Sequence, residues 1–138
     1  MTPITLADYF AGRDLQYADE LTEQIRVCAA VTVERANALL RAYADATGDT
    51  APRFVNSGWR PRAVNARVRG SAPRSRHVTG EAIDIDDRPG TLDSWCITTA
   101  GLAALELAGL WLEHPDSSPT WTHWQVVPPR SGRRVFKP

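Results

Sequence analysis

The stretch Ser75–Asp87, SRHVTGEAIDIDD, places charged side chains inside what is otherwise the pattern of a buried strand. Side chains alternate between the two faces of a strand, so Asp84 and Asp86 share one face while Ile83 and Ile85 share the other. A carboxylate that faces inward needs a partner, because burying an unpaired charge is strongly unfavourable. This stretch therefore restricts the chain to folds that bring a compensating group to Asp84.

A zinc ion is one partner that would satisfy Asp84. Catalytic zinc sites use three protein ligands chosen from His, Asp, Glu and Cys, and they leave a fourth position for water. His77 precedes Asp84 by seven residues, and Gly80 between them lets the chain turn tightly from a loop into the strand. The third ligand must come from one of the two remaining histidines, His114 and His123. We favour His123, because it lies in the strand pattern WTHWQ and would be adjacent to Asp84 if the two strands pair.

The pattern of apolar residues predicts an α+β fold with a small, mainly antiparallel sheet packed with helices. The predicted helices cover residues 4–12, 21–46 and 98–109, and the β-branched run at 31–33 is a point where the second could break. The predicted strands cover residues 53–61, 80–86, 110–114 and 121–127, with the last two forming a hairpin. We expect residues 62–76 to form a short helical turn and then an exposed loop, and residues 87–96 to form a loop.

Length and composition predict one domain over residues 1–138, since 138 residues with 43% hydrophobic content suit a single core. No window approaches the roughly 18 apolar residues of a membrane span, and the N-terminal region lacks the apolar core of a secretory signal. We therefore expect a protein without membrane contacts that is made in the cytoplasm without a signal peptide.

Arginine is concentrated in one segment of the chain. Seven of the 16 basic residues are arginines between residues 53 and 76, a span without any acidic residue. Such a cluster could bind nucleic acid through phosphates without sequence specificity. The formal net charge of zero and the lack of a recognition motif argue against that function, so we expect no specific nucleic-acid partner.

The stretch also resembles a known family, the zinc D-alanyl-D-alanine carboxypeptidases and dipeptidases with the related phage endolysin L-alanoyl-D-glutamate peptidases. Their signature is Ser-x-His-x-x-Gly-x-Ala-x-Asp, followed downstream by a strand that carries His. This chain has all five signature residues, Ser75, His77, Gly80, Ala82 and Asp84, and the later strand has His123. The resemblance, which runs from about Leu6 to the C-terminus, implies the D-Ala-D-Ala carboxypeptidase-like zinc peptidase fold, with Zn²⁺ bound by His77, Asp84 and His123.

Two further positions follow from the resemblance. The segment SGWRP is similar to the family's Ser-Gly-aromatic-Arg segment, which implies that Arg60 holds a carboxylate or carbonyl of the substrate. Family members often carry a general-base Glu or Asp three residues before the final histidine, where this chain has Thr120. Threonine cannot take a proton from water at neutral pH, so the base must lie elsewhere or be absent.

Glu113 and Asp116 are the candidates to replace this base. Glu113 faces the side of His123 if residue 113 pairs with 123, but the opposite side if residue 112 does, because a slip of one residue inverts every side chain. We favour Glu113, since a strand holds a side chain more rigidly than the loop that carries Asp116 does.

The resemblance implies a zinc metallopeptidase that hydrolyses a peptide bond in peptidoglycan stem peptides. It suggests a monomeric endolysin or virion-associated lysin, which acts on the cell wall after release or as part of a virion. Thr120 keeps an alternative open, a catalytically impaired, zinc-stabilised module that binds the cell wall or serves in a virion. The cleaved bond stays open among L-Ala-D-Glu, D-Ala-D-Ala and a cross-bridge.

Overall fold

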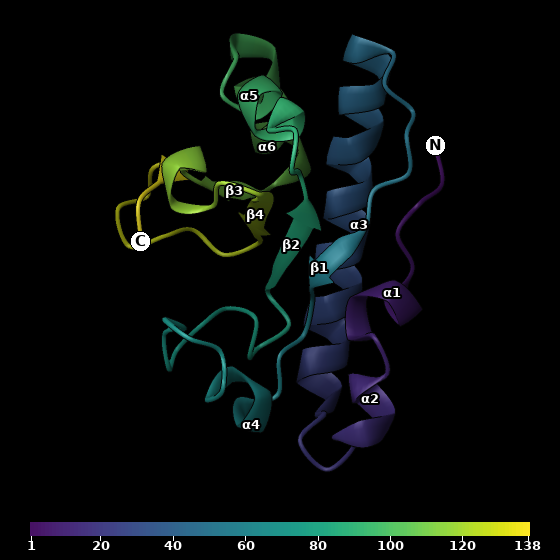
Figure 1. Ribbon diagram of the computed structural model, residues 1–138, viewed down its shortest axis with the longest axis vertical. Coiled ribbons are helices and arrows are strands. Elements are labelled where there is room, and N and C mark those ends of the chain that lie inside the picture. Colours follow the sequence, from purple (N-terminus) through teal and green to yellow (C-terminus); the bar gives the residue numbers. More distant parts are fainter.

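A long helix, α3 (Glu23–Thr47), packs against a five-stranded sheet in the computed structural model, which describes residues 1–138 (Figure 1). The strands are β1 (Val55–Ser57), β2 (Ala82–Asp86), β3 (Trp111–Glu113), β4 (Trp121–Gln125) and β5 (Val135–Phe136). Their order in the sheet is β1-β2-β4-β3-β5, and every pair is antiparallel except β3 with β5. The predicted α+β class with a mainly antiparallel sheet is confirmed, whereas β5 was not predicted.

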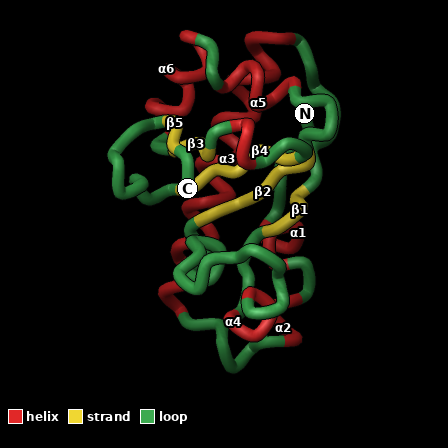
Figure 2. Tube along the Cα trace, turned by 60° about the vertical axis from the view of Figure 1, so that its left-hand side comes forward, coloured by secondary structure: helices red, strands yellow, loops and turns green.

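The remaining helices are short. They are α1 (Leu6–Phe10), α2 (Arg13–Gln16), α4 (Arg62–Asn65), α5 (Thr91–Cys96), α6 (Thr99–Ala108) and the 3₁₀ helix η1 (Pro115–Ser117). Helices α5 and α6 lie towards one end of the sheet, and the long loop that includes α4 lies towards the other (Figure 2). No helix combines the length and the apolar character needed to cross a membrane.

The core lies between α3 and the sheet. Leu39 and Leu40 of α3 and Ile83 and Ile85 of β2 are almost completely buried and belong to one apolar cluster. The opposite face of β2 carries Asp84, on the side where the loop around α4 and the C-terminal segment lie (Figure 1). The apolar face of the strand thus builds the core, and its polar face is left for a site.

Helix α3 is continuous through the β-branched run at residues 31–33, where a break was considered. Thr32 is fully buried there, and its hydroxyl lies 2.8 Å from the carbonyl oxygen of Gly80. This contact gives the polar side chain a partner inside the core and ties the loop before β2 to α3. The helices predicted over residues 21–46 and 98–109 are confirmed as α3 and α6, which end at the C-caps Gly48 and Gly109.

Two predicted elements differ from the structure. Strand β1 is shorter than residues 53–61, because the chain leaves the sheet after Ser57 and the Arg60 amide donates instead to the His77 carbonyl at 2.9 Å. The loop predicted over residues 87–96 is wrong, because it contains α5. Asp87, in this predicted loop, is buried, and its carboxylate accepts the amides of Leu92 and Asp93 at 3.2 and 2.9 Å. This buried carboxylate stabilises the first turn of α5.

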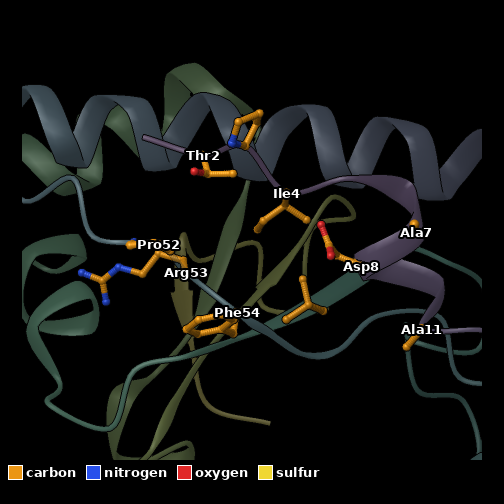
Figure 3. A pocket seen from close by; sticks show the side chains of 10 residues that line it. Thr2, Ile4, Ala7, Asp8, Ala11, Pro52, Arg53 and Phe54 are labelled. Atoms are coloured by element: carbon orange, nitrogen blue, oxygen red, sulfur yellow. The ribbon is translucent and has the colours of Figure 1, made fainter.

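The N-terminal segment lies over the edge of the sheet at β1. The side chain of Asn37 in α3 holds it, accepting the Ile4 amide and donating to the Ile4 carbonyl, both at 2.8 Å. A cavity of about 430 Å³ remains between this segment and residues 52–55, with Ile4 and Asp8 facing Phe54 across it (Figure 3). None of the three histidines lines this cavity.

The buried carboxyl of Asp93 predicts a pH-dependent stability. Burial raises its pKa from 3.8 to about 7, so the folded state binds more protons than the unfolded state between about pH 4 and pH 7. Stability should therefore fall as pH rises through this window. Asp93→Asn should be more stable than the wild type, with an advantage that grows by about 2 kcal/mol from pH 5 to pH 8 in urea unfolding. The exposed substitution Asp19→Asn is the control, and an advantage of Asp93→Asn that does not change with pH would contradict this account.

Candidate metal centre

Strand pairing brings the first two predicted ligands together. In the register of β2 and β4, Asp84 lies directly opposite His123, as predicted from the two strand patterns. The His123 Nδ1 atom is 2.7 Å from Asp84 Oδ1, and both residues are only 9% exposed. The carboxylate is thus buried beside an imidazole on the polar face of the sheet.

The third group, His77, comes from the loop before β2. Its Nε2 atom lies 3.3 Å from Asp84 Oδ2, and its Nδ1 atom lies 2.8 Å from the carbonyl oxygen of Gly58. Since a carbonyl can only accept, Nδ1 carries the proton and Nε2 keeps its lone pair facing Asp84. His77 is 3% exposed, so the loop presents it to the sheet rather than to solvent.

Two glycines allow the loop to reach this position. Gly80 has a φ of +77°, and a β-carbon there would lie 2.9 Å from the Ile25 carbonyl oxygen of α3. A β-carbon at Gly58 would overlap the backbone carbonyl of Tyr9. Tyr9 in turn donates its buried hydroxyl to the Ala82 carbonyl at 2.9 Å. The backbone around His77 is therefore clamped between α1, α3 and β2.

The donor set fits a divalent cation. One ligand atom from each of His77, Asp84 and His123 can be chosen so that all lie within 4.8 Å of one another, and all three residues are buried. In each imidazole, the nitrogen that points away from Asp84 faces an acceptor. For His77 this is Nδ1 with the Gly58 carbonyl oxygen, and for His123 it is Nε2 with Gln125 Oε1 at 3.5 Å. Such outer partners orient histidine ligands in metal sites. Two imidazoles and one carboxylate with room for a solvent ligand match the ligand number of catalytic zinc sites.

The electrostatics also suit a cation. Burial alone would raise the pKa of Asp84, but the adjacent His77 and His123 hold it well below its usual range, so the carboxylate is ionised. Burial lowers the pKa of His77 despite the nearby Asp84, which keeps this imidazole neutral and able to ligate. For His123, burial lowers the pKa, but the hydrogen bond to Asp84 and the negative charges of Asp84 and Glu113 together outweigh burial and raise it, so a cation would have to displace its proton.

The hairpin register answers the question left open for Glu113. Leu112 lies opposite Trp124, so residue 113 lies opposite 123 and Glu113 shares the face of His123. Glu113 also lines the cavity that contains the three clustered residues, and burial raises its pKa. Asp116 is exposed, contacts Lys137 at 3.9 Å and does not line that cavity. The geometry therefore favours Glu113 over Asp116 as a group that can exchange protons at this site.

Arg60 lies at the same cavity and is held from two sides. Its guanidinium donates to Asn65 Oδ1 at 3.2 Å and to Ser57 Oγ at 3.1 Å, and it lies 3.9 Å from Asp84 Oδ2. It is 9% exposed. A buried, oriented guanidinium of this kind can hold a carboxylate or a carbonyl oxygen beside the centre.

Comparison with protein families identifies the chain. The sequence model of the family described as Peptidase M15 matches residues 10–101, which is more than half of the chain. The chain belongs to the peptidase M15 family. This membership confirms the resemblance drawn from the signature between Ser75 and Asp84. The matched range includes Arg60 and His77, whereas Glu113 and His123 lie beyond it.

A solved structure is also similar to this M15 peptidase. The crystal structure of Serratia marcescens L-Ala D-Glu endopeptidase ChiX matches it with a TM-score of 0.48 and 22% sequence identity. The match covers 82% of this chain and 93% of that chain. No curated protein sequence matches this chain.

Sequence reasoning missed the residues that support the site. Gln125 lies two positions after His123 on the same face of β4, and its amide donates to the Val127 carbonyl at 2.7 Å, which turns Oε1 towards the imidazole. That alternation could have identified Gln125. Asn65, which orients Arg60, lies in α4, and no pattern in the sequence indicated its contact with Arg60.

Removal of either histidine should abolish tight zinc binding. We expect His77→Ala and His123→Ala to weaken Zn²⁺ affinity more than about 100-fold, since loss of an outer-shell partner alone weakens metal binding 10–100-fold. Isothermal titration calorimetry with Zn²⁺ measures this directly. The control is His114→Ala, because His114 accepts the Asp116 amide at 3.2 Å and lies outside the cluster. Undiminished affinity in either variant would remove that histidine from the centre.

Proposed function

We propose that this M15 peptidase is a zinc-dependent enzyme that hydrolyses a peptide bond in peptidoglycan stem peptides. The observation that carries the proposal is the buried convergence of His77, Asp84 and His123 in one cavity with Glu113. We further propose that residues 1–138 act as a single zinc peptidase domain and as a monomer. The resemblance to phage endolysins supports an endolysin or virion-associated lysin as its setting.

In this proposal His77, Asp84 and His123 hold the metal. When bound, Zn²⁺ supplies Lewis acidity, which polarises a carbonyl and makes water more acidic. The chain's contribution is to keep the three ligands oriented before the metal arrives. The hydrogen bonds of His77 to Gly58 and of Gln125 to Val127 support this role, because they fix the imidazole planes from outside.

Glu113 acts as the general base. It accepts the proton that the attacking water releases and then donates it to the leaving amine. Its half-buried position on β3 and its raised pKa support this role, because a base whose pKa lies nearer to the working pH can both take and return a proton. Glu113 thus takes the role of the acidic residue that family members often carry at the position of Thr120.

Arg60 positions the substrate. Asn65 and Ser57 hold its guanidinium at the cavity, so little side-chain freedom is lost when it binds a carboxylate or a carbonyl of the stem peptide. This fixes the scissile bond relative to Glu113 and the metal ligands.

The proposal predicts metal-dependent release of peptides from the cell wall. Purified peptidoglycan digested with the protein should yield soluble fragments that mass spectrometry detects as hydrolysis products. A chelator should stop their release, and added Zn²⁺ should restore it. The product masses identify the cleaved bond. Binding of wall fragments with no released peptide would contradict the proposal and favour the catalytically impaired wall-binding module that Thr120 suggests.

The base can be tested separately from the metal. Glu113→Gln should keep Zn²⁺ bound while kcat falls at least about 100-fold, the range expected for loss of a general base. Metal content by mass spectrometry and peptide release from peptidoglycan give the two readouts. Asp116→Asn is the matched control and should retain activity. If Asp116→Asn loses activity and Glu113→Gln does not, the assignment of the base is wrong.

A further inference from the structure

The cavity at the metal centre is rich in arginine. It has a volume of about 390 Å³, and its lining includes four guanidinium groups, those of Arg60, Arg69, Arg74 and Arg76. The only acidic side chains in its lining are Asp84 and Glu113, which the proposed function assigns to the metal and to proton transfer. The loop between α4 and β2 therefore delivers three additional positive charges to the rim of the site.

Two neighbouring cavities extend this positive surface. One, of about 890 Å³, is lined by Arg62, Arg74 and Arg76, and the other, of about 560 Å³, by Arg76, Arg130 and Lys137. Neither has an acidic side chain in its lining, and Arg76 borders all three cavities. We call this surface the basic groove; its cations are Arg62, Arg69, Arg74, Arg76, Arg130 and Lys137. The cavity at the metal centre shares lining residues with both neighbouring cavities.

Most of these cations have no partner within the protein. The side chains of Arg62, Arg69 and Arg74 form no hydrogen bond or ion pair, and Arg76 reaches only Glu81, at 3.5 Å near the surface. By contrast, Arg53 in the same segment contacts two carboxylates, at 2.6 and 3.7 Å. The fold thus leaves a set of like charges uncompensated at a concave surface, where the electrostatic field is concentrated.

We propose that the basic groove selects anionic stem peptides, binding those with free carboxylates more tightly than the same peptides with carboxamides. This inference rests on the proposed function and extends it to residues outside the metal centre. A carboxylate accepts paired hydrogen bonds from a guanidinium and gains charge attraction, whereas a carboxamide is neutral. Because the cations are exposed, salt should weaken the preference.

The test compares two synthetic stem peptides that differ at one group, D-isoglutamate in one and D-isoglutamine in the other. Zinc-loaded Glu113→Gln protein, whose turnover should be at least about 100-fold slower, binds both peptides before they are cleaved, and calorimetry gives both dissociation constants. We expect the carboxylate peptide to bind at least about tenfold more tightly at low salt. In the Glu113→Gln background, Arg74→Gln with Arg76→Gln should reduce the ratio to less than about threefold, and Arg74→Gln alone should give an intermediate value.

The control substitution is Arg41→Gln, on the exposed surface of α3 and outside the groove, which should leave the ratio unchanged. Unchanged zinc content and melting temperature in every variant exclude a disturbed fold. Equal affinity for the two peptides would overturn the inference, even if wild-type protein cleaves both and the proposed function stands. Wild-type protein that binds the carboxylate peptide preferentially but cleaves neither would instead overturn the proposed function. If the protein binds a single-stranded DNA 20-mer more tightly than the carboxylate peptide at 150 mM salt, the inference is also overturned, because the groove would then favour phosphate.

Discussion

The buried carboxylate of Asp84 is the constraint around which the rest of the structure is arranged. An ionised group on a central strand is tolerated only where opposite charge or strong donors surround it. His123 supplies a donor across the strand pair, and His77 of the preceding loop places its Nε2 atom 3.3 Å from the same carboxylate. The loop can do so because Gly58 and Gly80 permit backbone contacts that a side chain would block. A cation bound by these three groups would compensate the carboxylate more fully than two imidazoles can.

The periodicity of apolar residues predicted those helices and strands whose formation depends mainly on neighbouring residues in the sequence. Alternation around Asp84 predicted β2, and the three-and-four spacing of apolar residues predicted α3. The pairing of Asp84 with His123 followed from two strand patterns, each of which carries a side chain that can bind a metal. The side of Glu113 could not be predicted, because it depends on a register that changes by a slip of one residue.

The wrong predictions share a physical cause: polar groups in these segments bond to partners that are distant in the sequence. Helix α5 was missed because its first turn is capped by Asp87, whose burial depends on the packing of α5 against β4. The short β1 ends early because Arg60 and Gly58 bond to His77, which lies far along the chain. Residues 62–76 were predicted to form a short helical turn and an exposed loop, yet this loop folds so that Arg74 and Arg76 border the site. Composition alone cannot distinguish a convex charged surface from a concave one.

The most direct test of this account is the position of zinc in the folded protein. Crystals grown with Zn²⁺ and measured at the zinc absorption edge would locate the ion by its anomalous scattering. We predict one strong peak at about 2.0–2.2 Å from His77 Nε2, an Asp84 oxygen and His123 Nδ1, with solvent as a further ligand. Zinc found elsewhere, with His123 Nδ1 still 2.7 Å from Asp84 Oδ1, would contradict the account.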